Sequence, residues 1–248
     1  MIVFPLVTAH TGCMGMPDNS AASAREGLSL GADIIEDDIR VTRDGIPVLS
    51  HDDRVGLADG RERSVSGLTL QELNEGLAAP IVLLETVLKL LDNYPGARMN
   101  LDLKTDDSIG PVAALVQKLG IVDRVFLTGC EYDRALQANS HDNGIAKLLN
   151  VDINSFRNNE FMDAVGQACR EAADSGCFGL NVPYQIVRPE LMDFAADKGL
   201  SVFIWTVNEA QEMRKYAAMG VGSITTRDVA ALLLVKQQWR KESAADEL

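Results

Sequence analysis

The stretch Ala32-Asp-Ile-Ile-Glu-Asp-Asp38 decides the fold, because an apolar strand-forming run ends there in three consecutive acids. The next apolar run, Ile46-Pro-Val-Leu-Ser50, leads directly into His51. Neighbouring side chains in a strand point to opposite faces, so Glu36 and Asp38 share one face and Asp37 points to the other. The pattern predicts two adjacent strands that bring a pair of carboxylates and an imidazole to one rim.

Two further predicted strands carry polar residues at or near their ends. Residues 3–9 lead into His10, and residues 98–104 place Asn100, Asp102 and Lys104 on one strand face. A single histidine after a strand is more often a hydrogen-bonded loop residue than a catalyst. Packing alone, however, gives no reason for polar residues to gather at the ends of successive apolar runs, so the set indicates a functional site.

The rest of the chain alternates between strand and helix patterns. A helix is expected over 20–30, with Asp18, Asn19 or Ser20 as its cap and Gly31 as its stop. Further helices are expected over 81–91, 109–119, 132–139, 158–173, 189–198 and 210–219 and from about 228 onward. Strands are expected over 3–9, 32–38, 98–104, 124–128, 145–151, 178–182, 201–206 and 221–225. The segment 52–80 is polar and is expected to be a loop with one short helix, with a capping box at Thr69-Leu-Gln-Glu72.

Eight strand–helix units in 248 residues indicate an α/β protein with a single-domain (β/α)8 TIM barrel. The barrel is assigned to residues 1–238 and a polar C-terminal tail to 239–248. In this fold the functional face lies at the carboxyl ends of the strands. The candidate residues of the four runs all fall at such ends.

Composition excludes several classes of partner. A net charge of −13 disfavours nucleic acid and anionic membranes, since a polyanion would be repelled. The four cysteines are scattered without C-x-x-C spacing and indicate free thiols in a reducing compartment. The apolar start of the chain lacks a basic leader and is interpreted as a strand, and apolar runs long enough for a membrane span are absent. We therefore expect a cytoplasmic protein with a small-molecule substrate and without stable membrane association, and a homodimer is possible.

The motifs resemble the glycerophosphodiester phosphodiesterase family. The likeness rests on Ala9-His10-Thr-Gly12, Pro17-Asp-Asn-Ser20, Gly31 to Gly45, Val48-Leu-Ser-His51-Asp52, Asn100-Leu-Asp-Leu-Lys104 and Trp205-Thr-Val-Asn208. It continues to residues 220–226 and is weakest over 120–200, where alternation is the main feature.

The resemblance implies roles for these residues. His10 and His51 would be the general acid and base, with their order left open, and Glu36, Asp38 and Asp102 would bind a divalent metal. An all-carboxylate set suits a hard cation such as Mg²⁺ or Ca²⁺. Substrate or phosphate contacts would come from Lys104, Thr11, Trp205 and Asn208. The implied reaction is hydrolysis of a glycerophosphodiester to glycerol 3-phosphate and an alcohol.

Several positions depart from the family pattern. Thr11 stands where the family has an arginine, which removes a bidentate phosphate donor. Either phosphate binding is weaker as a result, or another residue such as Arg188 supplies the missing cation. Asp102 stands for a glutamate, as in the related phospholipase D-like toxins. The closing motif becomes Thr225-Thr-Arg-Asp228, which is expected to affect substrate shape. The connection 52–80 is interpreted as short, so that an open site would accept headgroups other than glycerol.

Two alternative functions stay open on sequence. One is a lysophospholipase D-like or cyclising phosphodiesterase that acts on another headgroup with the same residues. The other is a non-catalytic barrel that binds phosphorylated ligands, as the missing arginine would suggest. Retention of both histidines and all three acids favours the enzyme.

Overall fold

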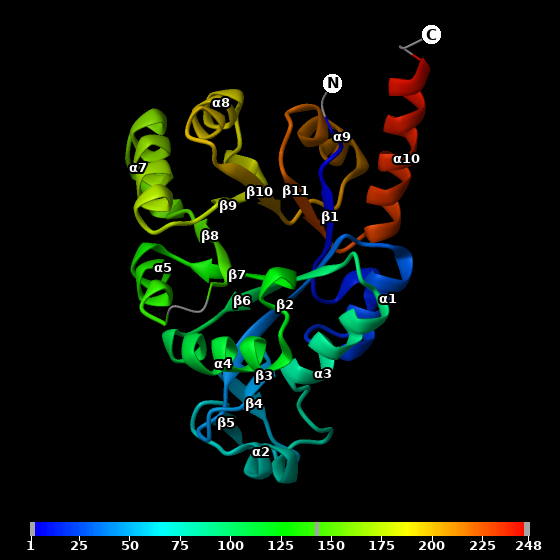
Figure 1. Cartoon of the computed structure of the whole chain (residues 1–248). Helices are drawn as coiled ribbons and strands as arrows, with labels where there is room; N and C mark the ends of the chain where they lie inside the picture. Colours follow the sequence, from blue (N-terminus) through cyan, green and yellow to red (C-terminus); the bar gives the residue numbers. More distant parts are fainter. Residues whose placement is uncertain (1–2, 142–143, 246–248) are drawn as a thin grey trace.

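The computed structural model describes residues 3–141 and 144–245, which form a closed barrel of parallel strands surrounded by helices (Figure 1). In order around the barrel its strands are β1 (Leu6–Ala9), β2 (Ile34–Val41), β6 (Arg98–Leu103), β7 (Val125–Cys130), β8 (Ala146–Asn150), β9 (Gly179–Pro183), β10 (Ser201–Trp205) and β11 (Ser223–Thr226). Closure comes from β1, which pairs with β2 on one side and with β11 on the other. The predicted (β/α)8 barrel is confirmed. A further strand, β3 (Pro47–Leu49), pairs antiparallel with β2.

Helices cover the outside of the barrel. They are α1 (Ala21–Leu30), α3 (Leu84–Leu88), α4 (Ile109–Leu119), α5 (Tyr132–Asn139), α6 (Ile153–Asn158), α7 (Phe161–Asp174), α8 (Pro189–Asp197), α9 (Ala210–Ala218) and α10 (Val229–Ala245). Short 3-10 turns occur at η1 (Cys13–Gly15), η2 (Lys89–Asn93), η3 (Asp106–Ser108), η4 (Val122–Arg124) and η5 (Tyr184–Ile186). Helix α1 has the predicted ends: the Ser20 side chain accepts the Ser23 N–H, and Gly31 adopts φ +94°. Helices α4 and α5 have the predicted bounds, whereas α6 was not expected.

Two apolar regions hold the barrel together. The larger one lies between the strands and the surrounding helices, and it includes the four cysteines, all buried and unpaired. A separate apolar cluster contains Ile34, Phe126, Leu148 and Phe203. The rings of Phe126 and Phe203 each pack edge-on against Phe178, at centroid distances of 5.8 and 5.7 Å. Most of these residues lie early in their strands, so apolar packing fills that end of the barrel and the carboxyl ends remain for polar side chains.

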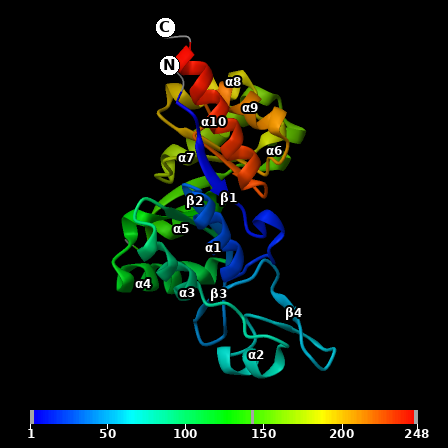
Figure 2. The same cartoon turned by 90° about the vertical axis from the view of Figure 1, so that its right-hand side faces the viewer.

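The segment after β3 forms a small lobe that projects from the barrel (Figures 1 and 2). It contains a hairpin of β4 (Arg54–Gly56) and β5 (Glu62–Ser64), followed by α2 (Leu70–Gly76). The short helix and its Thr69 capping box are confirmed, whereas the hairpin was expected to be part of the loop. The hairpin strands are short and largely exposed, so they lack the apolar alternation that marks a strand. The lobe has its own core, in which Val65 and Leu73 pack with Val48 of β3.

A polar tail was expected from residue 239 onward, but helix α10 extends through this part of the chain. The helix continues past residue 238 to Ala245. Trp239 packs edge-on against Phe4 at a centroid distance of 5.9 Å, and Glu242 pairs with Arg214 at 2.8 Å. An apolar contact and an ion pair therefore join this part of the helix to the barrel; residues 246–248 lie outside the described part of the chain.

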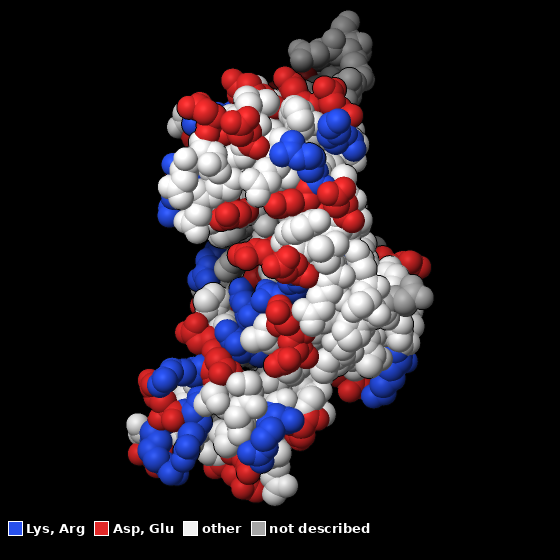
Figure 3. Space-filling view, turned by 90° about the vertical axis from the view of Figure 1, so that its left-hand side faces the viewer, with Lys and Arg blue, Asp and Glu red and all other residues white. Residues whose placement is uncertain are grey.

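The outer surface carries mixed charge. On the face that carries α5 and α7, acidic and basic side chains are interspersed (Figure 3). Among the described residues, no helix is both long and apolar enough to cross a membrane.

Candidate active site

A cavity of about 570 Å³ opens at the carboxyl ends of the barrel strands. Its lining residues come from nearly every strand or the loop that follows it: His10, Thr11, Asp18, Asn19, Glu36, Asp38, His51, Asn100, Asp102, Leu103, Lys104, Thr128, Gly129, Glu131, Arg134, Asn150, Asn181, Trp205, Thr225 and Arg227. Both predicted histidines and all three predicted acids are among them. The structure thus brings together residues that lie far apart in sequence.

Three carboxylates form a cluster at the base of this cavity. Strand alternation turns Glu36 and Asp38 to the same side, and the parallel register of β2 and β6 pairs Asp38 with Asp102. Oxygens of these three residues lie within 4.8 Å of one another. Burial, followed by the charges of Asp102 and Asp38, raises the pKa of Glu36 well above its usual value. Asp37 does not line the cavity.

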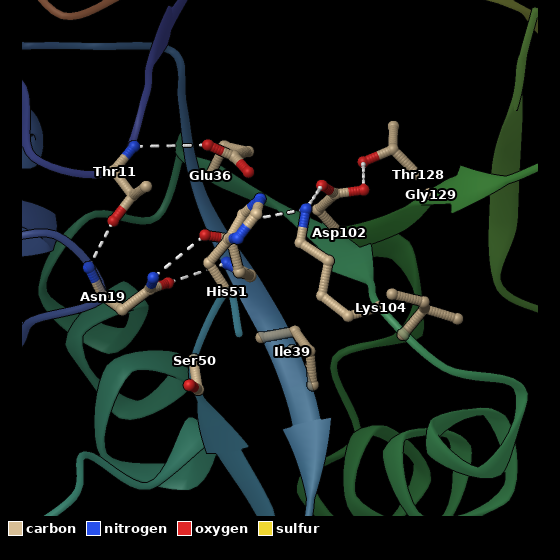
Figure 4. A network of polar contacts seen from close by, with 12 residues as sticks. Thr11, Asn19, Glu36, Ile39, Ser50, His51, Asp102, Lys104, Thr128 and Gly129 are labelled. Atoms are coloured by element: carbon tan, nitrogen blue, oxygen red, sulfur yellow. Dashed lines mark hydrogen bonds and ion pairs between the residues drawn. The ribbon is translucent and has the colours of Figure 1, made fainter. Parts of the chain in front are cut away.

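Lys104 balances part of this negative charge. Its ammonium group lies 2.7 Å from Asp38 Oδ1 and 2.5 Å from Asp102 Oδ2 (Figure 4). Burial alone would lower the pKa of Lys104, but the two carboxylates outweigh it and raise that pKa. Lys104 therefore stays charged and is held by the acid cluster.

The loop after β1 supports the cluster through backbone and amide contacts (Figure 4). The Thr11 N–H donates to Glu36 Oε2 at 3.2 Å, and the Thr11 hydroxyl accepts the Asn19 N–H at 2.5 Å. Asn19 forms a two-way link with Asp38, since its Nδ2 donates to Oδ2 and its Oδ1 accepts the Asp38 N–H. From sequence Asn19 was only a candidate helix cap. Its position next to the cap of α1 gave no sign of this second role.

The two histidines differ in their surroundings. His10 Nδ1 lies 2.8 Å from the Thr11 carbonyl oxygen, which can only accept, so Nδ1 carries the hydrogen and Nε2 is the acceptor. Burial is the largest influence on His10 and lowers its pKa. The His10 Nε2 atom lies 3.9 Å from Glu36 Oε2. His51 is more open, with 68% of its side chain exposed, and its Nδ1 lies 2.8 Å from Asp52 Oδ1.

Of the other residues predicted to contact substrate or phosphate, Trp205 lines the cavity, whereas Asn208 and Arg188 do not. Trp205 lines the cavity, and its indole nitrogen is buried with no hydrogen-bond partner among the described residues. Asn208 is not part of the cavity lining; its Oδ1 accepts the Thr226 hydroxyl and the Arg227 N–H. Arg188 lies over the ring of Phe161, 4.2 Å from its centroid, and is also outside the lining. It is therefore not placed to replace the arginine missing at position 11.

Sequence reasoning missed two cavity arginines. Arg134 is anchored at the carboxyl ends of β6 and β7, where its Nη1 donates to the carbonyls of Leu103 and Gly129, and its Nε donates to Asp106 in the loop after β6. Arg227 follows β11 and pairs with Asp18 at 2.9 Å. The parallel arrangement of β11 beside β1 is the signal that could have placed Arg227 near His10.

The donor set fits a hard divalent cation. Three carboxylates offer oxygen ligands within a small space, and the lining supplies no cysteine thiolate. Burial and mutual repulsion make the acids costly to hold ionised together, which a bound cation would relieve.

Comparisons with known proteins agree with this geometry. Residues 10–231 match the model of the glycerophosphoryl diester phosphodiesterase family. A glycerophosphodiester phosphodiesterase from Caldanaerobacter subterraneus is 27% identical, covering 92% of this chain and 96% of the relative. The structure of such an enzyme from Thermotoga maritima superposes with a TM-score of 0.75 at 20% identity, covering 95% and 99% of the two chains.

An Oleispira antarctica phosphodiesterase, solved in complex with the product sn-glycerol-3-phosphate, also has a TM-score of 0.75 at 20% identity, covering 94% of this chain and 96% of its own. The family match covers most of the chain, including all five cavity residues that the sequence singled out as catalytic or metal-binding. The chain belongs to the glycerophosphoryl diester phosphodiesterase family.

Proposed function

We propose that this protein is a metal-dependent phosphodiesterase that hydrolyses glycerophosphodiesters to glycerol 3-phosphate and an alcohol. The observation that carries the proposal is the meeting of His10 and His51 with the three-carboxylate cluster in one cavity. The Oleispira antarctica phosphodiesterase, which has the same fold, was solved with sn-glycerol-3-phosphate bound, and this supports the same product here.

In this proposal Glu36, Asp38 and Asp102 hold Mg²⁺ or Ca²⁺. The bound cation would supply positive charge that stabilises the phosphoryl oxygens as negative charge develops in the transition state. Lys104 adds a second positive charge beside Asp38 and Asp102. Thr11 and Asn19 keep the carboxylates in place through their hydrogen bonds to Glu36 and Asp38.

We assign His10 as the general base. Its Nδ1 donates to the Thr11 carbonyl, so the Nε2 lone pair is available to take a proton from the attacking oxygen. A pKa lowered by burial keeps this ring neutral at neutral pH.

His51 is then the general acid. Its Nδ1 contacts the Asp52 carboxylate, which orients the ring and leaves Nε2 as the atom that passes a proton to the leaving alkoxide. The attacking oxygen is either water or a neighbouring hydroxyl of the glycerol, and the second route would form a cyclic phosphate first.

The test measures hydrolysis of glycerophosphocholine and glycerophosphoethanolamine by purified protein with added Mg²⁺ or Ca²⁺, followed by phosphorus NMR. His10→Gln and His51→Gln should each lower kcat by about 10²- to 10⁴-fold, the range for loss of a general acid or base. His141→Gln is the matched control, since His141 is exposed and does not line the cavity.

Each outcome bears on a separate part of the proposal. Turnover by either cavity variant at the wild-type rate would remove that histidine from the mechanism. A transient cyclic phosphate signal would identify attack by the substrate hydroxyl. Failure of the wild-type protein to hydrolyse either substrate with metal bound would overturn the glycerophosphodiester assignment.

A further inference from the structure

The proposed phosphate site has few uncommitted cations. The ammonium of Lys104 is held between two carboxylates, and the residue after His10 is the neutral, buried Thr11. Nε of Arg134 donates to Asp106, and its Nη1 donates to the carbonyls of Leu103 in β6 and Gly129 in β7. The third lysine or arginine of the described cavity lining is Arg227, whose Nη2 pairs with the half-exposed Asp18 at 2.9 Å.

Barrel closure brings Arg227 beside His10. The register of β1 and β11 pairs Ala9 with Thr226, and the His10 N–H donates to the Thr226 carbonyl at 2.9 Å. The next residue along each strand is therefore His10 on one side and Arg227 on the other. Their closeness follows from the register of the barrel, although the two residues are separated by most of the chain.

The backbone of Arg227 is held on both sides. Its N–H donates to Asn208 Oδ1 at 2.9 Å, and its carbonyl accepts the Met14 N–H at 2.8 Å. Asn208 thus contributes to the site by fixing this loop, in place of the direct substrate contact that the sequence suggested. A fixed backbone reduces the conformational freedom that the guanidinium would lose when it binds an anion.

The side chain of Arg227 extends over the loop after β1. A Cβ at Gly12, where φ is +73°, would lie 3.3 Å from Arg227 Nη1 and 2.0 Å from Asp18 Oδ1. Glycine therefore leaves room for the pair of Asp18 and Arg227. Nη2 of Arg227 lies 2.9 Å from Asp18, and 46% of the arginine side chain is exposed.

The positive charge of Arg227 affects the pKa of His10. After burial, which is the largest cause, Arg227 contributes to the lowered pKa of His10, while Asp38 and Asp18 oppose it. Arg227 and His10 also line the same cavity, in which the base would meet the substrate.

We propose that Arg227 binds the phosphate of the substrate and supplies the guanidinium that position 11 lacks, with Asp18 as its positioning residue. This inference rests on the proposed function of the cavity. A guanidinium offers several N–H donors in a planar fork, so one edge can stay on Asp18 while another donates to a phosphate oxygen. A lysine at this position would supply the charge without the fork.

The test measures binding of sn-glycerol 3-phosphate to the metal-loaded protein by calorimetry, alongside KM for glycerophosphocholine. Arg227→Gln should raise both the Kd and the KM by about 10- to 100-fold, as expected for loss of a charge-assisted hydrogen bond. Arg227→Lys should recover only part of this loss. Arg188→Gln is the matched control, because Arg188 lies outside the cavity lining and should leave both constants unchanged.

Two further measurements separate phosphate binding from a structural ion pair. Asp18→Asn removes the ion pair that positions the guanidinium but keeps its charge, so it should raise the Kd by less than Arg227→Gln does. If Arg227 only stabilises the loop, Asp18→Asn and Arg227→Gln will lower Tm equally and leave the Kd unchanged, which would overturn the proposal. Full recovery by Arg227→Lys would show that charge alone is sufficient and would overturn the role given to the guanidinium fork.

Failure of this inference is distinguishable from failure of the proposed function. Binding of sn-glycerol 3-phosphate that depends on Arg227, in a protein that hydrolyses neither glycerophosphodiester, would support the phosphate assignment and reject the activity. Hydrolysis that is indifferent to Arg227→Gln would support the activity and reject the assignment.

Discussion

Replacing Asp37 with asparagine should stabilise the protein at neutral pH. Asp37 is 1% exposed, and neither of its carboxyl oxygens has a hydrogen-bond partner among the described residues. Burial is the largest cause that raises the pKa of Asp37 from 3.8 to about 8, and the nearby charges of Asp38 and Asp18 also raise it. Asp37 therefore holds its proton in the folded protein at pH 7, whereas the unfolded chain would release it.

The magnitude and its pH dependence follow from linkage. For each pH unit above 3.8, keeping Asp37 protonated in the folded protein costs about 1.4 kcal/mol. At pH 7 this cost lowers the free energy of unfolding by up to about 4 kcal/mol. The folded pKa is the higher one, so the penalty is absent below 3.8, grows as the pH rises toward about 8 and is constant above it. Asparagine keeps the shape and polarity of the neutral carboxyl but cannot ionise.

The assay is urea unfolding of the metal-free protein in chelator at pH 5, 7 and 8.5. Asp37→Asn should gain more stability over wild type at pH 7 than at pH 5, and most at pH 8.5. Asp123→Asn, at an exposed aspartate in η4, is the control and should show no such trend. Equal stability of Asp37→Asn and wild type at all three pH values would refute the reasoning.

Three other predictions concern the metal site, the last helix and the lobe. Added Mg²⁺ or Ca²⁺ should raise Tm in a concentration-dependent way, by an amount equivalent to about 2.7 kcal/mol at 100 times the Kd, and Asp102→Asn should weaken this shift; an unchanged Tm for wild type would contradict the metal site. Trp239→Ala should lower the free energy of unfolding by about 1–3 kcal/mol in urea, since it removes the contact with Phe4, whereas a dispensable tail would give no change. Leu73→Ala should speed hydrogen exchange in α2 while the barrel strands keep their protection, because Leu73 belongs to the separate core of the lobe; equal acceleration in both would show that lobe and barrel unfold together.

Regular periodicity explains which elements could be predicted. Helices α4 and α5 have the bounds that their sequence pattern indicates, and α1 ends at the predicted serine and glycine. The β4–β5 hairpin was missed because its strands are three residues each and mostly exposed. An element that is buried on one face shows a regular spacing of apolar residues in its sequence, whereas a short exposed strand lacks this spacing.

The catalytic candidates were predictable for a related reason. Glu36 and Asp38 share a face because side chains alternate along a strand, and this depends only on sequence positions. His10 and His51 follow apolar runs, Asp102 lies near the end of a strand that alternates polar and apolar residues, and the barrel places the carboxyl ends of its strands together. Local periodicity and a recognisable fold class were therefore sufficient to assemble the acids and histidines.

The chain's sequence by itself determined the alternation of strands and helices, the shared face of the acids and the family resemblance. Only the tertiary structure decided which arginine lies near His10: Arg188, suggested from sequence, stacks on Phe161, while Arg227 reaches the cavity. It also decided that Asn208 supports the Arg227 loop and that Asn19 links to Asp38. These contacts depend on strand register and barrel closure, which join segments distant in sequence and leave no periodic signal in either one.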